Sequence, residues 1–387
     1  MRKICHVTSV HGRYDPRIFS KQCRSLVCAG YDVSLVVNDE LHNEVSDGVK
    51  IVSTGYKPKN RINRFLVSRR NLFDLVKEVD ADVYHFHDPE LIPIATKIKR
   101  QFGRTVIFDF HENTQRQILD KEWIPYPLRS LIANLYAAYE KRAIRRYDAL
   151  ISVTPEIVER LRVTNKNTVM VTNYPIIESS VKRRTDKSTL CFAGGVSEQW
   201  CHAKIIEALE RVGDVKYLLF GSGPKEYLDY LKELPGWAKV DYRGRIPHSE
   251  VKREYYNASI GMALNYSTQI KGEGTLGNTK LFEYMEAALP VICSDYRLWK
   301  DIVEQHQCGI AVNPHDVGEI AQAIEYLVNN PEDAIQMGQN GRRAIVEHYN
   351  WGTQEAVLID LYDSLLGVRR GSYLEDCNNC GRKASIC

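Results

Sequence analysis

Short runs of β-branched and aromatic residues alternate with helix-length segments along the whole chain. The expected strands of the first half are residues 3–9, 32–37, 49–53, 83–86, 105–110, 149–153 and 168–171, and those of the second half are residues 189–193, 217–220, 240–242, 260–263, 291–293 and 309–312. Helices fit between them, for example over residues 18–29 and 127–146. This alternation is typical of parallel sheets covered by helices. The sequence therefore predicts an α/β fold with two doubly wound, Rossmann-like domains.

The length of 387 residues is too great for one hydrophobic core and suits two domains. Residues 177–188 are polar and charged without periodicity, which indicates a linker. We therefore expect an N-terminal domain over residues 1–176, a C-terminal domain over residues 189–350, a last helix over residues 351–368 and a disordered tail over residues 369–387. The tail holds Cys377, Cys380 and Cys387, one ligand short of a zinc site.

The composition is that of a globular protein, with 44% hydrophobic and 26% charged residues. No apolar run approaches the roughly 20 residues that cross a bilayer, and the first residues are typical of a strand rather than of a signal peptide. Ten scattered cysteines fit a reducing compartment. We expect a cytoplasmic protein.

Positive charge is concentrated in residues 1–175, which hold 28 Lys and Arg against 20 Asp and Glu. This half could bind anionic lipid or a phosphorylated acceptor, so peripheral binding to the inner face of the cell membrane is a further expectation. Within residues 61–73, cations interleave with apolar residues and form what we call the membrane stripe: Arg61, Ile62, Arg64, Phe65, Leu66, Arg69, Arg70 and Phe73. A second cationic cluster comprises Lys141, Arg142, Arg145 and Arg146. The alternative is that the stripe packs on the core. Nucleic acid is not an expected partner, because these cations are not interleaved with aromatics in a recognised module.

Residues 277–292 predict an anion site in the second half, where a polar turn enters a helix and Pro290 leads into a strand. The turn, which ends at Asn278, Thr279 and Lys280, lies where the first helical turn leaves N–H groups unpaired. Glu283 follows one turn later, placed to accept hydrogen bonds from a sugar diol. The alternative is an ordinary amphipathic helix with a polar start.

Three strand ends in the second half carry glycines that expose backbone amides. They are Gly194 with Gly195, the turn at residues 220–224, and the loop at residues 242–248, which includes Arg245 and could hold a base through main-chain contacts. Each is weak alone, since such turns are common. Together with the Lys280 helix they predict a nucleotide-diphosphate site.

Three strand ends in the first half carry polar residues, at the edge where open parallel sheets bind ligands. These residues are Gly12, Asp15 and Arg17, then His87, Asp88 and Glu90, and finally His111. Gly12 permits close backbone approach, Arg17 could clamp an anion, and the acids could accept from sugar hydroxyls. The alternatives are a helix-start signal at Asp15, turn capping by Asp88 and a structural role for His111. A metal is the less favoured reading, because acids this close in a turn diverge.

Residues 277–292 resemble the nucleotide-sugar-binding region of family 4 glycosyltransferases, usually written NKLFEYMAAGLPVI. The opening loop is similar to VHxRxDxRIF, residues 87–91 to HDPEL, residues 109–112 to the segment with the family's donor-facing histidine, residues 173–175 to NxP and residues 349–351 to YNW. The resemblance implies the GT-B fold, with the acceptor on the first domain, the nucleotide-sugar on the second and catalysis in the cleft. It also implies a retaining enzyme of surface-polysaccharide assembly, and a last helix that returns to the first domain.

For individual residues, the resemblance implies that His111 contacts the transferred sugar and that Glu283 holds the ribose. Lys280, its helix N-terminus and the Gly194–Gly195 amides would bind the diphosphate without an obligatory metal. The expected donor-binding set is Gly12, Gly194, Gly195, Arg245, Asn278, Thr279, Lys280 and Glu283, and the expected acceptor-binding set is Asp15, Arg17, His87, Asp88 and Glu90. The expected co-substrate is a nucleotide-diphosphate sugar, and the expected acceptor is a saccharide or a lipid-linked saccharide.

Two departures set this chain apart from the family pattern. The paired glutamates E-x7-E would fall at Thr275 and Glu283, so the first is missing. The usual Arg and Lys after the Gly-Gly turn are also absent, which leaves Lys280 or Lys204 to reach the diphosphate. The rival functions are an epimerase or phosphorylase on the same fold, and a non-catalytic nucleotide-sugar-binding partner of a polysaccharide assembly complex.

Overall fold

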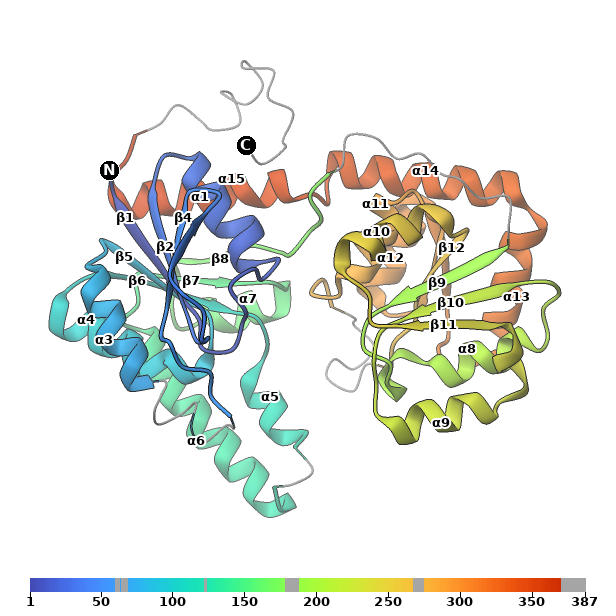
Figure 1. Cartoon of the computed structure of the whole chain (residues 1–387), viewed down its shortest axis with the longest axis horizontal. Coiled ribbons are helices and arrows are strands. Elements are labelled where there is room, and N and C mark those ends of the chain that lie inside the picture. Colours follow the sequence, from blue (N-terminus) through green and yellow to red (C-terminus); the bar gives the residue numbers. More distant parts are fainter. Residues whose placement is uncertain (60–62, 64–68, 122–123, 178–187, 267–274, 370–387) are drawn as a thin grey trace. The chain divides into compact units, whose positions relative to one another are not determined.

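The computed structural model describes residues 1–59, 63, 69–121, 124–177, 188–266 and 275–369 (Figure 1). The chain forms two compact units. Unit 1 comprises Met1–Asn173 together with Trp351–Cys387, and unit 2 comprises Tyr174–Asn350. Each is an α/β unit with its own sheet and core.

Unit 1 contains an eight-stranded sheet in the order β3-β4-β2-β1-β5-β6-β7-β8. Its strands are β1 (Lys3–Val7), β2 (Asp32–Val37), β3 (Glu44–Ser46), β4 (Val49–Ser53), β5 (Val83–Phe86), β6 (Thr105–Phe110), β7 (Ala149–Ser152) and β8 (Thr168–Met170). All neighbours pair in parallel except β3, which runs antiparallel to β4. The strand order reverses between β1 and β5, so their carboxyl ends frame the edge where such sheets bind ligands.

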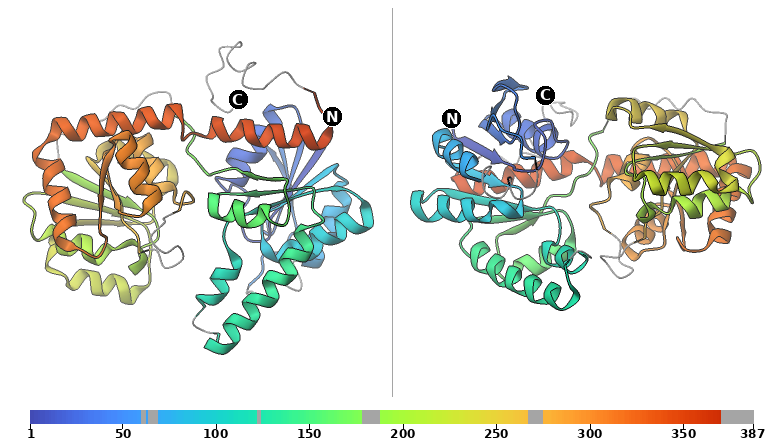
Figure 2. Two further views of the ribbon diagram at one scale, coloured as in Figure 1. Left: turned by 180° about the vertical axis from the view of Figure 1, so that it is seen from behind. Right: turned by 60° about the horizontal axis from the view of Figure 1, so that its bottom comes forward.

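Helices cover both faces of this sheet, as the two views in Figure 2 show. They are α1 (Arg24–Cys28), α3 (Arg69–Val79), α4 (Ile92–Phe102), α5 (Thr114–Leu119), α6 (Tyr126–Ile144), α7 (Pro155–Arg162) and α15 (Trp351–Leu366). The central strands β5 and β7 are buried along their whole length because both faces are covered.

The last helix, α15, completes unit 1 although it follows unit 2 in the sequence. Trp351 Nε1 donates to Ser25 Oγ at 2.9 Å, and the backbone N–H of Thr172 donates to Gln354 Oε1 at 2.7 Å. Tyr362 is fully buried, and its hydroxyl lies 2.8 Å from His85 Nδ1 on β5.

Unit 2 contains a six-stranded parallel sheet in the order β11-β10-β9-β12-β13-β14. Its strands are β9 (Thr189–Ala193), β10 (Lys216–Phe220), β11 (Val240–Gly244), β12 (Ile260–Ala263), β13 (Val291–Ser294) and β14 (Gly309–Val312), and its helices are α8 (His202–Leu209), α9 (Lys225–Glu233), α10 (His248–Asn257), α11 (Thr279–Glu286), α12 (Arg297–His306), α13 (Val317–Asn329) and α14 (Pro331–Glu347). The order is the Rossmann arrangement 3-2-1-4-5-6, and it places the carboxyl end of β9 at the switch point.

The structure differs from the expected elements mainly at edges. The hairpin strand β3 was not predicted, because three residues are too few to show alternation. The first strand ends at Val7 rather than at residue 9, because Thr8 and Ser9 turn to bind the Asp88 carboxylate. Of the membrane stripe, Phe73 is half-buried against the unit 1 core with Lys97 Nζ 3.6 Å from its ring centroid, so this residue follows the packing alternative.

Several expectations fall outside the described residues. They are most of the linker (178–187), the tail from residue 370, and residues 61, 62 and 64–66 of the membrane stripe. Among the residues that are described, none of the helices combines the length and apolarity of a membrane span.

Candidate active site

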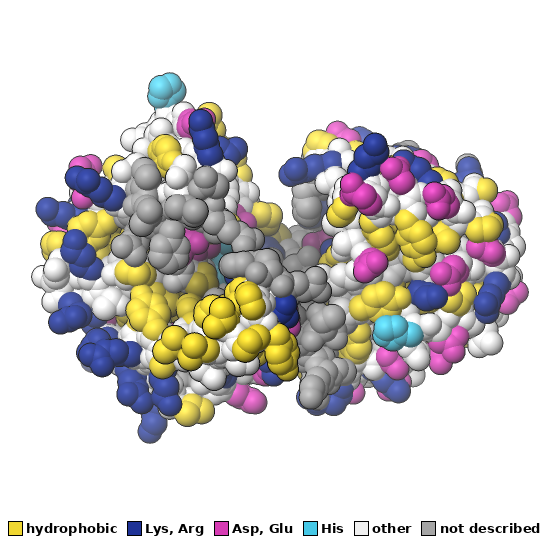
Figure 3. Space-filling view, turned by 90° about the horizontal axis from the view of Figure 1, so that it is seen from below, with side chains coloured by type: hydrophobic (Ala, Val, Ile, Leu, Met, Phe, Trp, Pro, Cys, Tyr) yellow, Lys and Arg dark blue, Asp and Glu magenta, His cyan; other side chains and the backbone are white. Residues whose placement is uncertain are grey.

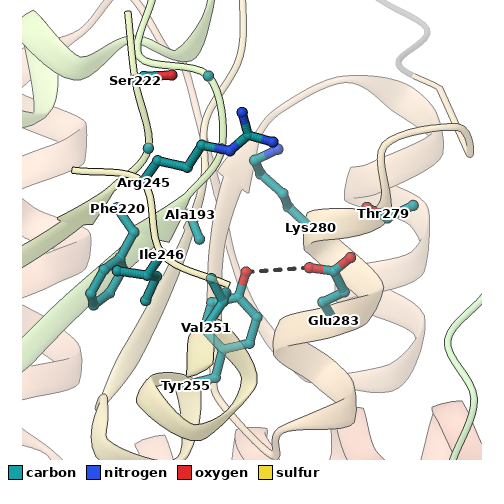
Figure 4. A pocket seen from close by; sticks show the side chains of 13 residues that line it. Ala193, Phe220, Ser222, Arg245, Ile246, Val251, Tyr255, Thr279, Lys280 and Glu283 are labelled. Carbon is teal, nitrogen blue, oxygen red and sulfur yellow. Dashed lines mark hydrogen bonds between the residues drawn. The ribbon is translucent and has the colours of Figure 1, made fainter. Parts of the chain in front are cut away.

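A cavity of about 440 Å³ in unit 2 lies beyond the carboxyl ends of β9, β10 and β11, against the start of α11 (Figure 4). Its lining includes Gly194, Gly195, Arg245, Thr279 and Lys280 of the predicted donor-binding residues, together with Glu283. The predicted Asn278 is not part of the lining, and Gly12 belongs to unit 1. The cavity therefore brings together six residues that the sequence analysis drew from three separate motifs.

The glycine turns exist because two loops pack backbone against backbone. A Cβ on Gly221, whose φ is +137°, would lie 1.7 Å from the Gly194 carbonyl oxygen, and a Cβ on Gly194 would lie 2.7 Å from Lys280 Cε. The Gly194 N–H donates to the Phe220 carbonyl at 3.0 Å. This amide is used within the protein, which corrects the expectation that it faces a diphosphate.

Lys280 and Arg245 bring two cationic head groups together at the cavity, where their side chains point toward one another (Figure 4). The Lys280 ammonium lies 3.9 Å from the Trp200 ring centroid and 5.1 Å from that of Phe192. Burial lowers the pKa of Lys280, and the charge of Glu283 partly opposes this. Among the described residues, neither cation lies at salt-bridge distance from a carboxylate. Two cations without an acidic partner suit an anion.

Asn278 caps α11 and does not line the cavity. Its Oδ1 accepts the Lys280 backbone N–H at 3.1 Å, so one of the amides expected to bind phosphate is already satisfied. The buried Asn278 Nδ2 has no hydrogen-bond partner among the described residues. The start of α11 thus contributes mainly the Lys280 side chain and Thr279.

Glu283 faces the cavity from the second turn of α11. Its Oε2 accepts a hydrogen bond from the Tyr255 hydroxyl at 3.2 Å, drawn as the dashed line in Figure 4. The remaining acceptor positions of this carboxylate can serve a diol. Tyr255 was not predicted as a site residue, and its sequence context in an ordinary helix of unit 2 offers no signal for that role.

The two departures from the family pattern have structural counterparts. Thr275 Oγ1 accepts the Gly277 N–H at 3.0 Å and the Thr275 carbonyl accepts Trp299 Nε1 at 2.8 Å, so this position shapes the turn before α11. Lys204 Nζ lies 2.8 Å from Glu207 Oε2 on α8. Of the two lysines considered for the diphosphate, only Lys280 lines the cavity.

In unit 1, the predicted anion clamp Arg17 is committed to Asp109 on β6. Arg17 is 5% exposed, and its Nε and Nη2 donate to Asp109 Oδ2 at 3.1 and 2.8 Å. Gln22 Nε2 donates to the same oxygen at 2.9 Å. Burial alone would raise the pKa of Asp109, but the Arg17 charge together with the charge of His111 and the hydrogen bonds of His111 and His87 outweighs burial and holds that pKa well below its usual range.

A chain of histidines runs from His111 into the interior of unit 1. His111 Nε2 lies 3.3 Å from His87 Nδ1, and His87 Nε2 lies 2.9 Å from His6 Nδ1. His6 Nε2 lies 3.2 Å from the Tyr362 hydroxyl, which also contacts His85 Nδ1. Burial lowers the pKa of His87 to about 3, although Asp109 opposes the shift. Only His111 reaches the surface, with 21% of its side chain exposed.

The other predicted acceptor residues of unit 1 organise the loops at the same edge. Asp88 Oδ2 accepts from Thr8 Oγ1 at 2.8 Å and from the Ser9 N–H at 2.6 Å, which is the turn-capping alternative. Glu90 Oε1 accepts from Ser9 Oγ at 2.7 Å. His87 is buried in the histidine chain. The role of Asp88, Glu90 and His87 in binding an acceptor stays a prediction.

Asp15 and Gly12 form the opening loop. Asp15 Oδ1 accepts the backbone N–H groups of Arg17 and Ile18 at 2.8 and 2.9 Å, which is the helix-start alternative. Burial would raise the pKa of Asp15, but hydrogen bonds from His11 and from Ile18 N–H lower it to about 2. Gly12 is exposed, and a Cβ there would meet nothing within 4 Å.

Among the described residues of unit 1, two groups have the spacing of metal ligands. One is His6, His85 and His87, and the other is His87, Asp109 and His111. The Asp109 Oδ2 that would bind an ion in the second group already accepts three hydrogen bonds, two of them from a guanidinium. We therefore derive no metal-dependent step from either group.

Solved structures with the same fold match nearly the whole chain. Sucrose-phosphate synthase from Thermosynechococcus elongatus superposes with a TM-score of 0.76 at 17% identity, over 95% of this chain and 100% of that one. Anabaena Alr3699/HepE, solved in complex with UDP and glucose, superposes with a TM-score of 0.68 at 11% identity, over 94% and 100%. The fold is therefore the GT-B fold.

Comparisons with family models and with related sequences identify the family to which the chain belongs. Residues 17–171 match Glycosyltransferase Family 4, and residues 174–344 match Glycosyl transferases group 1. The Bacillus subtilis protein named as glycosyltransferase EpsD is 22% identical over 370 residues, covering 88% of this chain and 91% of that protein. A GDP-mannose-dependent alpha-(1-6)-phosphatidylinositol monomannoside mannosyltransferase of Mycobacterium tuberculosis is 27% identical over 155 residues, or 39% and 40% of the two chains. The chain is a family 4 glycosyltransferase that uses a nucleotide-sugar donor.

Proposed function

We propose that this chain transfers a sugar from its nucleotide-sugar donor to a lipid-linked saccharide acceptor, with retention of anomeric configuration, in surface-polysaccharide assembly. Support for the acceptor class comes from a relative whose name states a phosphatidylinositol monomannoside substrate. The positive balance of residues 1–175 suits an acceptor with an anionic head.

The observation that carries the proposal is the pair of cations, Lys280 and Arg245, at a cavity that also presents Glu283. Glycosyl transfer develops negative charge on the departing diphosphate, and preorganised cations stabilise that charge in the transition state. Trp200 and Phe192 hold the Lys280 ammonium before any ligand arrives, so little reorganisation is needed. This arrangement takes the place of the Arg and Lys that the family usually carries after its Gly-Gly turn.

The remaining roles follow the family resemblance. Glu283 accepts the ribose hydroxyls while Tyr255 fixes its carboxylate. His111 contacts the transferred sugar near the reacting carbon. Front-side attack assisted by the leaving phosphate gives retention without a side-chain base, and the carboxylate that lines the cavity, Glu283, serves the ribose in this assignment.

Thermal-shift measurements with UDP, GDP and their sugar conjugates test the donor site, because a ligand that binds only the folded state raises its stability. We expect at least one nucleotide to raise the melting temperature of the full chain. Glu283→Ala should weaken the binding of that nucleotide by about 10- to 150-fold, as measured by calorimetry, because a charge-assisted hydrogen-bond acceptor is worth about 1.5–3 kcal/mol.

The matched control is Glu304→Ala, which removes an exposed acid of α12 paired with Lys300 and should leave affinity unchanged. Equal affinity of Glu283→Ala and wild type would make Glu283 a helix-surface residue. Product analysis with and without acceptor addresses the reaction: an altered sugar nucleotide formed without acceptor would indicate an epimerase, and binding without turnover on any acceptor would indicate a non-catalytic partner.

A further inference from the structure

Helix α6 of unit 1 exposes a row of large apolar side chains. Leu131, Ile132, Leu135 and Tyr139 lie three, four, seven and eleven residues after Leu128, so the five side chains share one face of the helix. Between 40% and 63% of each of these residues is exposed. Tyr126, at the start of the helix, is 83% exposed.

The side of α6 that packs on the protein carries buried apolar residues and one buried acid, Glu140. Ala133, Ala143 and Ile144 are buried there. A surface helix normally turns a polar face to water, and a helix that is apolar all round is normally buried. The row therefore indicates that a second surface covers α6 when the protein works.

This row is unusual within the molecule as well. Of the eighteen exposed large hydrophobic residues found in the described part of the chain, six lie on α6. Single exposed apolar side chains are ordinary, whereas a contiguous patch marks a binding surface. Figure 3 looks onto this side of unit 1 and shows hydrophobic side chains gathered together, with Lys and Arg side chains next to them.

Within residues 126–146, the exposed charged side chains all have one sign. Lys141, Arg142, Arg145 and Arg146 are exposed at the C-terminal end of α6, and Arg142 continues the apolar row by one turn. The acidic residue of α6, Glu140, is 2% exposed and bonds to Arg160 Nη1 at 2.6 Å. The exposed side of the helix thus presents aliphatic side chains and cations, and no carboxylate.

We propose that α6 is a membrane-docking helix that lies in the plane of an anionic lipid surface. The apolar row enters the boundary between headgroups and acyl chains, and the four cations contact the headgroups, which is the arrangement of interfacial amphipathic helices. A second copy of this chain is a poorer partner, because the row would meet a surface with the same cations and no acid.

This surface differs from the purely electrostatic docking expected from the sequence, and the difference is measurable. Charge attraction decays over a Debye length of about 8 Å at physiological salt, whereas inserted apolar side chains resist salt. Binding to anionic vesicles should weaken as salt is added but should not vanish.

Co-sedimentation of the full chain with vesicles tests the proposal, using phosphatidylcholine alone and phosphatidylcholine mixed with phosphatidylglycerol. We expect binding to the mixed vesicles that persists in part at high salt. The double variant Leu131→Ser with Leu135→Ser should bind at least about tenfold more weakly and should lose the salt-resistant part. The double variant Lys141→Gln with Arg142→Gln should keep the salt-resistant part and lose preference for the anionic lipid.

The matched control replaces two exposed apolar residues elsewhere, Val163→Ser and Ile335→Ser, and should bind as wild type. All these positions are exposed, so the melting temperatures of the variants should match that of wild type. Equal binding of wild type and the leucine variant, or no binding of wild type to mixed vesicles, would overturn the proposal. A concentration-dependent dimer that the leucine variant abolishes, without vesicle binding, would assign the row to self-association instead.

Discussion

His111 lies at the surface of unit 1, at the outer end of the buried histidine chain. Its Nε2 is held by His87, which leaves Nδ1 as the ring atom that can face a ligand. Its side chain is 21% exposed, and the residue follows β6 rather than belonging to the strand. A residue held in this way can be removed without loss of fold.

His111→Ala should lower kcat by about 100-fold or more, in the range seen when one donor to a transition state is removed. Stability should fall by only about 1 kcal/mol, the usual cost of one hydrogen bond. Nucleotide affinity should not change, because the nucleotide cavity is lined by residues of unit 2. Steady-state kinetics, calorimetry with the nucleotide and thermal unfolding separate the three effects. A variant that melts early and keeps its specific activity would mark His111 as a packing residue.

Arg17 shows what the sequence alone could not reveal at this scale. An arginine at a helix start beside a glycine loop indicates an anion site. Arg17 does not serve as one here, because its guanidinium is bonded to a carboxylate of the protein. That partner, Asp109, lies 92 residues away in the sequence, inside an apolar strand. Lys280 and Glu283 were found because both come from one local motif at a helix start. Trp200 and Tyr255 were missed because their cavity roles depend on neighbours brought together by the fold.

At the scale of elements, the carboxyl ends of β1, β5 and β6 meet α15 around neutral histidines. Burial lowers the pKa of His87 to about 3 from 6.5, and the pKa values of His6 and His85 are also lowered well below 6.5. The charge of Asp109 raises the pKa of all three histidines, but burial lowers these pKa values by more. The Arg17 guanidinium faces the same group. Between the folded and unfolded pKa values the unfolded chain binds more protons, so the free energy of unfolding rises with pH there. This stability is fully present above about pH 6.5 and is lost as the pH falls.

We therefore expect the unfolding free energy of the chain to decrease between about pH 7 and about pH 5, by about 2 kcal/mol for each buried neutral histidine. His87→Gln should make that slope shallower by one histidine's share, whatever it does to stability at neutral pH. The exposed His42→Gln is the control and should leave the slope unchanged. Denaturant unfolding at several pH values supplies the slopes, and an unaltered slope for His87→Gln would contradict neutral burial of this ring.

Elements were predictable where one local pattern decides them. The strands at residues 32–37, 83–86 and 105–110 are bounded apolar runs, and the structure has them at those bounds. The helix expected at residues 127–146 is present as α6, but the helical period could not tell which apolar side is covered. Its exposed row became visible only when the packing of unit 1 showed which residues face the sheet.

At the scale of the whole molecule, the two units have different chain paths. Unit 2 is one continuous stretch, Tyr174–Asn350, whereas unit 1 needs Trp351 and the helix that follows it. In unit 1, Leu358, Ile359 and Tyr362 of α15 are fully buried. Each buried side chain of this kind is worth about 1.5–3 kcal/mol, so α15 supplies an amount comparable with the 5–15 kcal/mol that holds a typical domain together.

A fragment of residues 174–350 should therefore fold alone and bind the same nucleotide with the affinity of the full chain, because every residue that lines the cavity lies within it. Residues 1–173 alone should be unfolded or strongly destabilised, since removing α15 uncovers Ser25, His6 and His85 and takes away the Asp363 partner of Tyr31. Adding residues 351–369 through a flexible linker should restore a cooperative transition. Circular dichroism, thermal unfolding and calorimetry measure these outcomes. Residues 1–173 that melt like the linked form would show that α15 contributes nothing to unit 1, and a 174–350 fragment that folds but binds no nucleotide would show that the cavity needs residues from outside unit 2.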